Sequence, residues 1–545
     1  MLERISDYFG NTPYVLVLLF FMAGLMINRK KENCRQVLLA CVLFTVLYPI
    51  MYIVCKQIGL QEESYRFLWL LPLSLIWALG MVLIWQKYRF RLVTGILLII
   101  MSIAVLGSIL TDSSTWKRVS NLYSLEDEVI EIARMLEDEA GDRYVRVLAE
   151  PSVMMQIRQY SSKIQWAYSG RDVMIQAQNR EINEDLKTDP QYRLAMAVQQ
   201  DIYVDEAALL NDICELQVDY LVLSGDNSFI EHLPEYVYEK YDISGAGTDR
   251  KYNLYRIDRS LASLEGFSVD KKAISVPGLE ASYRLVFVND MHIVSDQDVI
   301  NPDNDTEMLQ QRYDFFSLNG TPSYGTWQHL YPQLDQIGCD GIVFNGDMLD
   351  FYSDGNFSIL RKGMNQIQTP HIYLRADHDV SPYWCREMDA AYIDNAEASL
   401  DGNPEVAVLD YGELLVVGIN MNTDQISHDA VERIAELFEQ NIPVVIVAHV
   451  PFESVVDDSL ADASKAAWND RVLLWGNEEA DCYKPDTNTA RFLELLYAED
   501  SPVIAVVGAH LHFAHESMLT EQIPEYIFDA SYKGSIGLLE IKGKE

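Results

Sequence analysis

The chain has 545 residues, with 42 Lys and Arg against 81 Asp and Glu and a formal net charge of −39. At roughly 150 residues per domain, this length suggests three or four domains, and the negative charge argues against a nucleic-acid partner. Residues 1–110 carry ten basic against five acidic residues, whereas residues 111–545 carry 32 against 76. The net negative charge therefore comes entirely from residues 111–545.

Four apolar stretches predict that residues 1–110 form a membrane domain of transmembrane helices. Each is close to the roughly 20 residues that a helix needs to cross a bilayer, and none contains Lys, Arg, Asp or Glu. The stretches are residues 8–27, 37–55, 67–85 and 92–110. A cleaved signal peptide is the alternative for the first of them.

Basic residues set the expected orientation of this domain. They gather in the first and third loops between the stretches, and such loops face the cytoplasm. Both ends of the domain then face outward. We therefore expect an integral protein of the cell membrane, whose later domains are extracytoplasmic.

The rest of the chain divides into two α/β regions. Helical patterns alternate with short β-rich runs in residues 111–258, which predicts a small α/β domain. Residues 259–281 lack strong periodicity and are expected to be a linker. Residues 282–545 form the second region. The middle domain contains one histidine and no glycine-rich phosphate loop, so a packing or spacer role is the simplest interpretation.

The histidines gather in the last region. Nine of the ten follow residue 282, and several come just after apolar β-runs. Such runs predict strands buried on both faces, and ligands bind at the carboxyl ends of the strands in sheets of this kind. The blocks at these ends are Asp290-Met291-His292, Gly346-Asp347-Met348-Leu349-Asp350, Ala376-Asp377-His378-Asp379, His449 and His510-Leu511-His512.

These residue types are typical of a metal site. Carboxylates mixed with imidazoles suit Mn, Fe or Zn. The candidate ligands are Asp290, His292, Asp347, Asp377, His449, His510 and His512. Seven ligands are too many for one ion and suit two, and a shared carboxylate would hold the two ions about 3.5–4 Å apart.

In this order the five blocks resemble the calcineurin-like metallophosphoesterases, whose pattern is D-x-H, G-D-x-x-D, G-N-H-[DE], a lone His after a strand, and G-H-x-H. The resemblance covers residues 283–545, about half of the chain. It implies a four-layer αββα sandwich, two divalent ions and an attacking hydroxide held on them. The ligand sets it implies are Asp290, His292 and His512 for one ion, and Asp377, His449 and His510 for the other, with Asp347 as the bridge.

The resemblance also implies roles beyond the ligands. His378 would stabilise the phosphoryl group or protonate the leaving oxygen, and Asp379 could orient it. Asp350 is expected to support a ligand rather than to bind metal. The chain departs from the pattern at Asp377, which replaces an asparagine and should weaken the Lewis acidity of its ion. It also carries alanine where the third and fifth blocks have glycine.

The substrate is less determined. Few basic residues lie near the motifs, and Arg375 and Arg471 are the candidates for binding it. The long connection of residues 450–509 could form one wall of the site, or its tryptophans, Trp468 and Trp475, could simply pack a helix onto the sheet. The negative charge favours a phosphomonoester or phosphodiester of modest charge, with lipid-linked and envelope-linked esters as candidates.

The sequence therefore predicts a membrane-anchored, metal-dependent phosphoesterase. The alternative is a non-catalytic membrane-anchored binding or scaffold protein with a vestigial metal site. Hydrolysis at a centre other than phosphorus is also left open.

Overall fold

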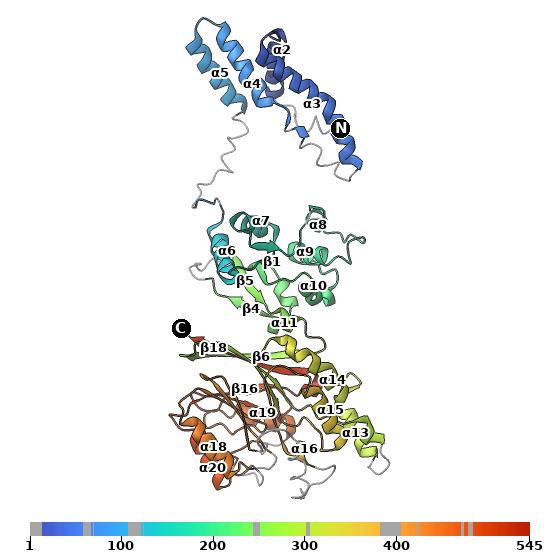
Figure 1. Cartoon of the computed structure of the whole chain (residues 1–545), viewed down its shortest axis with the longest axis vertical. Helices are drawn as coiled ribbons and strands as arrows, with labels where there is room; N and C mark the ends of the chain where they lie inside the picture. Colours follow the sequence, from blue (N-terminus) through green and yellow to red (C-terminus); the bar gives the residue numbers. More distant parts are fainter. Residues whose placement is uncertain are drawn as a thin grey trace. The chain divides into compact units, whose positions relative to one another are not determined.

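The computed structural model contains two compact units, Met1–Leu122 and Tyr123–Glu545. Helices and strands carry the labels of Figure 1. The residues that the structure describes are 13–57, 67–68, 70–106, 121–123, 125–169, 171–243, 251–300, 306–381, 405–421, 425–469, 474–477 and 483–544.

Apolar helices make up the described part of the first unit. They are α2 (Pro13–Ile27), α3 (Glu32–Gln57), α4 (Leu73–Lys87) and α5 (Arg91–Leu106). Among the described residues, α3 is the one helix long and apolar enough to cross a membrane by itself. The other three predicted spans stay predictions, since part of each lies outside the described residues.

Packing within this unit is local, and much apolar surface remains uncovered. Phe21 of α2 meets Trp77 of α4 edge-on, with ring centroids 5.2 Å apart. Gly80 permits this approach, because a Cβ there would lie 2.3 Å from Phe21 Cγ. Many apolar side chains of α3, such as Leu39 and Val46, are exposed. Exposed apolar surface of this extent is typical of a lipid- or protein-facing helix.

A five-stranded sheet lies at the start of the second unit, in the order β2-β1-β3-β5-β4. Strands β2, β1 and β3 are parallel, while β5 is antiparallel to both of its neighbours. The strands are β1 (Val145–Ala149), β2 (Ile164–Trp166), β3 (Tyr220–Ser224), β4 (Tyr238–Tyr241) and β5 (Tyr252–Ile257). The helices around them are α6 (Asp127–Ala140), α7 (Pro151–Tyr160), α8 (Arg171–Ala177), α9 (Pro190–Gln200) and α10 (Leu209–Glu215). Parallel strands alternate with helices here, as the sequence pattern indicates.

The expected linker is not an unstructured connection. Within residues 259–281 lie a short helix, α11 (Arg259–Ala262), and a ten-residue strand, β6 (Ser268–Pro277). Strand β6 runs parallel to β18 (Ser535–Lys544) along its whole length. The linker expectation is therefore wrong for these residues. Local periodicity is weak because β6 is an edge strand, and its pairing partner lies at the other end of the chain.

Two further sheets follow. One has the order β11-β10-β7-β18-β6, and the other has the order β12-β13-β14-β15-β17-β16. The first includes β7 (Tyr283–Val288), β10 (Gly341–Asn345) and β11 (His371–Leu374). The second consists of β12 (Val406–Asp410), β13 (Leu415–Ile419), β14 (Val444–Ala448), β15 (Val503–Gly508), β16 (His515–Met518) and β17 (Pro524–Ile527).

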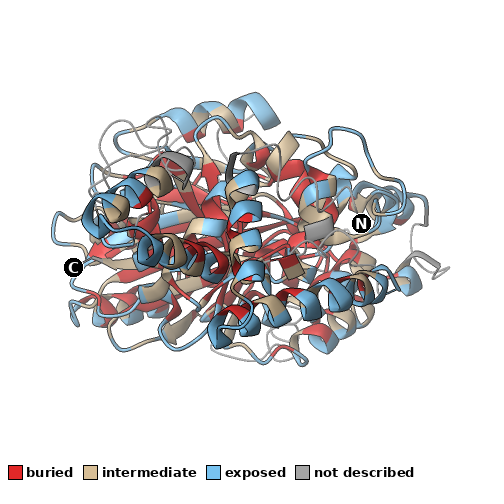
Figure 2. Ribbon diagram, turned by 90° about the horizontal axis from the view of Figure 1, so that it is seen from above, coloured by how far each residue is buried: buried red, intermediate tan, exposed pale blue. Residues whose placement is uncertain are grey.

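These two sheets pack face to face with helices outside them. Phe287 and Val343 of one sheet share a buried cluster with Val445 and Val507 of the other. Helices α14 (Ser323–Leu334) and α15 (Asp354–Met364) cover the outer face of the first sheet, and α18 (His428–Phe438) and α20 (Thr487–Leu496) cover that of the second. Figure 2 shows strands that are largely buried and helices with exposed outer faces. The layers are thus helix, sheet, sheet and helix.

Candidate metal centre

The candidate ligands lie just beyond the carboxyl ends of central strands. Asp290 follows β7, Asp347 follows β10, His449 follows β14, and His510 follows β15. In each sheet these strands are parallel neighbours, so their carboxyl ends meet at one edge. Apolar runs that end in Asp or His therefore place those side chains together.

Five of the site residues have left-handed backbone, which is uncommon for residues other than glycine. The φ angles are 45° at Asp290, 46° at His292, 50° at Asp347, 68° at His510 and 53° at His512. Backbone of this kind costs on the order of 1–2 kcal/mol per residue, and it gathers at functional sites. Backbone hydrogen bonds stabilise this left-handed conformation, among them one of 2.8 Å from His292 N to Asp347 O.

Gly346 has a steric role beside the site. Its φ is 79°, and a Cβ there would lie 2.5 Å from Nδ1 of His449. The glycine therefore allows His449 to lie directly against the β10 turn. Ala376, where the family pattern has glycine, has a φ of −113° and needs no glycine.

Three groups of side chains converge at this edge. They are Asp290, His292 and His512; His292, Asp347 and His378; and Asp347, His449 and His510. Within each group the candidate ligand atoms lie within 4.8 Å of one another. His292 Nε2 lies 3.1 Å from His512 Nε2, and His449 Nε2 lies 3.1 Å from Asp347 Oδ2. The first group is the set predicted for one ion, and the third contains the predicted bridge.

Hydrogen bonds from Nδ1 aim three of the histidines. His292 Nδ1 lies 3.2 Å from Asp350 Oδ1, His378 Nδ1 lies 2.7 Å from the Asp350 carbonyl oxygen, and His449 Nδ1 lies 2.7 Å from the Asn345 carbonyl oxygen. An acceptor at Nδ1 fixes the proton there and leaves the lone pair of Nε2 for a metal. The rings are thus oriented as metal ligands are.

The buried polar atoms of this site fit divalent ions. Asp290 Oδ1, Asp347 Oδ1 and His449 Nε2 are buried without a hydrogen bond of normal geometry in the described structure. Buried polar atoms left without a partner are costly. A cation accepts lone pairs from carboxylate and imidazole alike, so the residues present suit one or more divalent ions.

Acidic groups raise the pKa of two site histidines. Burial alone would lower the pKa of His449, but the Asp347 carboxylate outweighs it and raises the pKa to about 10. Burial also opposes the shift at His378, whose pKa Asp347 and then Asp377 raise to about 9. His510 shows the opposite shift, because burial and the charge of His449 lower its pKa to about 4. Protons on His449 and His378 thus balance the negative charge of the carboxylates in the site, and a bound metal would displace these protons.

Asp350 lies behind His292. Arg312 of α13 (Thr306–Phe315) donates from Nε to Asp350 Oδ2 over 2.8 Å, and from its terminal nitrogen to Oδ1. Burial would raise the pKa of Asp350, but the hydrogen bonds from His292 and Arg312 lower it to about 2. Sequence reasoning missed Arg312, because nothing local links α13 to a motif 38 residues away.

Asp379 accepts hydrogen bonds from nearby backbone N–H groups rather than from His378. Its Oδ2 accepts from the N–H groups of Asp347 and Ala376, each over 2.9 Å. Its Oδ1 accepts from Leu349 N over 2.9 Å and from the Tyr373 hydroxyl over 2.7 Å. No hydrogen bond to His378 is found among the described residues. Asp379 therefore positions the Asp347 turn, and a role in orienting His378 has no contact behind it.

Two further predicted residues, Asp377 and Arg375, belong to none of the three groups. Asp377 is exposed and belongs to none of the three groups of described residues, so its role as a ligand stays a prediction. Arg375 is buried, with 4% of its surface exposed, which does not suit a residue that meets substrate. Arg471 lies outside the described residues.

The long connection before β15 does reach the site, through Trp468 of α19 (Ser459–Trp468) and through Tyr483. Trp468 donates from Nε1 to Leu511 O over 2.8 Å, and its ring lies 5.7 Å from that of His512. Tyr483 reaches His510 Nε2 at 3.4 Å. Trp475 is instead buried beside Phe452 in the core. Trp468 therefore lies beside the metal centre, whereas Trp475 packs in the core from an isolated bridge with Phe452 and not from a helix.

Comparisons with known proteins add little to this geometry. No protein-family model and no curated protein matches the chain. Similar solved structures include a dimetal phosphatase from Danio rerio, at 9% identity and a TM-score of 0.29, covering 46% of this chain and 88% of that one. A purple acid phosphatase from yellow lupin (Lupinus luteus) seeds has 12% identity and a TM-score of 0.28, with 48% and 44% covered. A protein from Thermus thermophilus has 12% identity and a TM-score of 0.24, with 46% and 91% covered. TM-scores this low carry no conclusion about function.

Proposed function

We propose that this protein is a metal-dependent phosphoesterase anchored in the membrane. The observation that carries the proposal is the position of Asp347, which belongs to two of the three ligand groups. A carboxylate that lies close to two different sets of candidate ligands is suited to bridge two ions. Divalent ions such as Mn, Fe or Zn in this site would supply Lewis-acid activation of water and of a phosphoryl group.

We assign contact with the substrate to His378. Its side chain is 34% exposed, whereas those of His292 and His449 are 2% and 1% exposed. Its ring lies edge-on to that of His292, with centroids 5.0 Å apart. Because Nδ1 donates to the Asp350 carbonyl oxygen, the opposite nitrogen can hold or deliver a proton at the leaving oxygen.

The surroundings favour a substrate of modest charge. The part of the chain after residue 110 carries a net charge of −44, which repels polyphosphates and nucleic acids. Trp468 offers an apolar face that is 43% exposed beside His512. A phosphoester with an apolar or neutral group, such as a lipid- or envelope-linked ester, fits both features.

The exposed position of Asp377 supports a second candidate, a binding or scaffold protein with a vestigial site. If Asp377 does not bind metal, the chain still supplies three ligands to the second ion: Asp347, His449 and His510. Three protein ligands with an open position are typical of catalytic rather than structural sites. We therefore prefer the enzyme.

The decisive test uses the full chain in detergent with Mn²⁺, Zn²⁺ or Fe²⁺, assayed on an aryl phosphodiester and an aryl phosphomonoester. We expect turnover that Asp347→Asn and His449→Ala lower by at least about a thousandfold, together with loss of bound metal. His428→Ala is the matched control, because this exposed histidine begins α18 outside the groups. Metal binding without turnover of either ester would favour the scaffold.

Membrane orientation has its own test. The basic loops predict that residues after 110 face outward. A cysteine that replaces the exposed Asp138, in a chain whose native cysteines are changed to serine, should react with an impermeant thiol reagent on intact cells. Labelling that appears only after lysis would show the opposite orientation.

A further inference from the structure

A cavity of about 490 Å³ lies in the five-stranded sheet domain, away from the residues of the metal centre. It is lined by residues that follow β1, β3 and α9, among them Glu150, Asp201, Ser224 and Asn227. Its volume falls within the range of about 300–1,000 Å³ that small-molecule sites occupy.

The position of the cavity is where a sheet of this type binds ligands. The chain passes from β1 to β2 on one side and then crosses back to β3 on the other, so the strand order reverses at β1. Strands β1 and β3 are parallel neighbours, and their carboxyl ends open a crevice at such a switch point. Glu150 directly follows β1, and Ser224 ends β3.

Protein donors already hold one oxygen of each of two carboxylates in the cavity. Glu150 Oε1 accepts from Ser224 N and from Asn227 Nδ2, each over 3.2 Å, and from the Ser224 hydroxyl. Asp201 Oδ1 accepts from Tyr203 over 2.9 Å and from the Ser228 hydroxyl. In the described structure these contacts all end on Oε1 and Oδ1, so the second oxygen of each carboxylate is left for a ligand.

Asp201 and Gln199 are both fixed by the end of α9. Asp201 has left-handed backbone with a φ of 57°, and its N–H caps the helix. Gln199 donates from Nε2 to the Tyr168 hydroxyl over 3.2 Å, and Tyr168 donates to Ala149 O over 2.9 Å. This chain ties the amide of Gln199 to the end of β1, so the cavity wall is ordered before a ligand arrives.

The charges of the lining exclude a phosphate ligand. Arg180 is the one cationic residue among those that line the cavity, against three carboxylates, Glu150, Asp201 and Asp226. Glu150 also stands at the N-terminus of α7, the position that would otherwise attract an anion. A ligand here must offer hydrogen-bond donors to carboxylates and both donors and acceptors to amides and hydroxyls.

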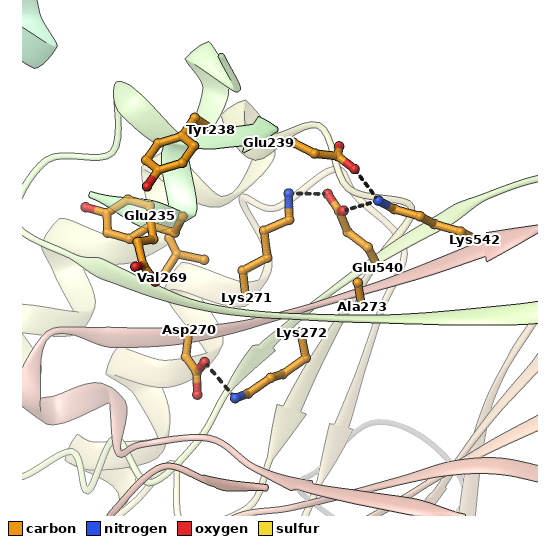
Figure 3. Close-up of a pocket in the computed structure, with 11 residues that line it drawn as sticks. Glu235, Tyr238, Glu239, Val269, Asp270, Lys271, Lys272, Ala273, Glu540 and Lys542 are labelled. Carbon is orange, nitrogen blue, oxygen red and sulfur yellow. Dashed lines mark hydrogen bonds and ion pairs between the residues drawn. The ribbon is translucent and has the colours of Figure 1, made fainter. Parts of the chain in front are cut away.

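A larger cavity, of about 670 Å³, is a weaker candidate (Figure 3). It lies between β4 and β6, and its lysines already have acidic partners. Lys271 lies 3.0 Å from Glu540, and Lys542 lies 2.6 Å from Glu239. Its charges serve contacts between the two sheets, whereas the switch-point cavity keeps acceptor oxygens available.

We propose that the switch-point cavity binds a neutral polyhydroxylated ligand, of the class of a sugar or a cyclic polyol. Vicinal hydroxyl groups can donate to the second oxygens of Glu150 and Asp201 while accepting from the amides beside them. This site would let the middle domain recognise a sugar-bearing molecule, free or part of a larger polymer, independently of the metal centre.

The test is saturation-transfer NMR with titration, on the full chain in a detergent without a sugar headgroup. The probes are glucose, N-acetylglucosamine, ribose, myo-inositol and a short glucose oligomer, with inorganic phosphate and AMP as comparators. We expect saturable binding of at least one polyol and none of the comparators at these residues. The oligomer distinguishes a free sugar from a polymer unit.

Variants assign the binding to the cavity. Glu150→Gln keeps an oxygen for Ser224 and Asn227 yet removes the charge, and Ser152→Trp fills the cavity from an exposed position. Each, like Asp201→Asn, should weaken binding at least about tenfold, the scale of one charge-assisted hydrogen bond. Asp138→Asn, an exposed carboxylate outside the cavity, should change nothing.

Three outcomes would overturn the proposal: no saturable polyol binding by the parent chain, binding unchanged by Ser152→Trp, or phosphate or AMP binding in place of a polyol. Phosphoesterase turnover, measured in parallel, is expected to stay the same in all four variants. Failure of the sugar site and failure of the proposed activity are thereby distinguishable.

Discussion

In the second unit, the sandwich and the five-stranded sheet each present polar residues at the carboxyl ends of parallel strands, and the two sets of residues differ in their chemistry. At the sandwich, Asp290, Asp347 and His510 follow parallel strands in left-handed backbone. At the five-stranded sheet, Glu150 follows β1 with an ordinary extended backbone, at φ −63° and ψ 149°. Both positions lie where α/β sheets bind ligands.

The difference lies in which polar atoms are already satisfied. At the sandwich, Asp290 Oδ1, Asp347 Oδ1 and His449 Nε2 are buried without a hydrogen bond of normal geometry in the described structure. At the smaller sheet, Glu150 Oε1 accepts three hydrogen bonds and Asp201 Oδ1 accepts two. Topology therefore places a site, while the residue types and their unmet bonds decide whether an ion or a neutral ligand completes it.

The largest predicted effect separates ligand from proton donor within the metal centre. His292→Ala should lower turnover and also release bound metal, because His292 Nε2 lies 3.1 Å from His512 Nε2 and 3.7 Å from Asp347 Oδ2, two other predicted ligands. His378→Ala should lower turnover by about 10²–10⁴, as expected for loss of a general acid, while metal content stays close to that of the parent. Turnover and elemental analysis on the same samples check both. Metal loss in His378→Ala would make His378 a ligand.

A buried carboxyl that has no cation beside it among the described residues should respond to pH in the opposite way to Asp350. Glu525 of β17 is fully buried, and burial raises its pKa to about 8, against the hydrogen bond from Phe452 N. Because the folded-state pKa is raised, folding is favoured most below about pH 4.5, and this contribution is lost as pH rises to about 8. Glu525→Gln should therefore stabilise the fold at pH 9 by a few kcal/mol and do little at pH 5.

Thermal unfolding at both pH values measures this effect. Glu521→Gln is the matched control, since Glu521 is exposed four residues away. Equal stabilisation by Glu525→Gln at pH 5 and pH 9 would mean that the Glu525 carboxyl does not titrate in this range.

Two arginine–aspartate pairs allow the next test, one in each region. Arg312 holds Asp350 behind His292, and Arg193 holds the buried Asp212 in the five-stranded sheet domain, with Nε 2.7 Å from Oδ2. Arg312→Gln should weaken metal affinity by about 10–100-fold, the usual cost of disturbing a ligand's support. Arg193→Gln should lower the melting temperature and leave metal affinity unchanged. Equal effects of the two on metal affinity would show general destabilisation.

The sequence predicts which of the candidate ligands lie close together, because their positions follow from strand ends. An apolar run that ends in Asp or His specifies both an element and an edge of the sheet, so Asp290, Asp347 and His449 can be grouped without a structure. Asp377 fails to join a group because it follows a short strand and begins α16 (Asp377–Val380), where its side chain is exposed. A motif position fixes the backbone more firmly than it fixes the direction of a side chain.

Features that depend on distant partners could not be predicted. Strand β6 pairs with β18 about 270 residues later, and Arg312 reaches Asp350 from a helix with no motif of its own. The switch-point cavity combines Glu150, Asp201 and Asn227 from three separate segments, and each alone is an ordinary polar residue. Their closeness comes from the strand order, which local periodicity does not contain.

The smallest predicted effect concerns the wall of the metal centre. Trp468 is 43% exposed beside His512, so Trp468→Ala should raise KM a few-fold, roughly 1 kcal/mol, with less change in kcat. Trp468→Phe keeps an apolar ring, so its KM should lie between that of the parent chain and that of Trp468→Ala. Trp475→Phe changes a buried ring instead, and should lower the melting temperature while KM stays the same. If Trp468→Ala lowers kcat and metal content together, Trp468 positions His512 through the Leu511 carbonyl and does not contact substrate.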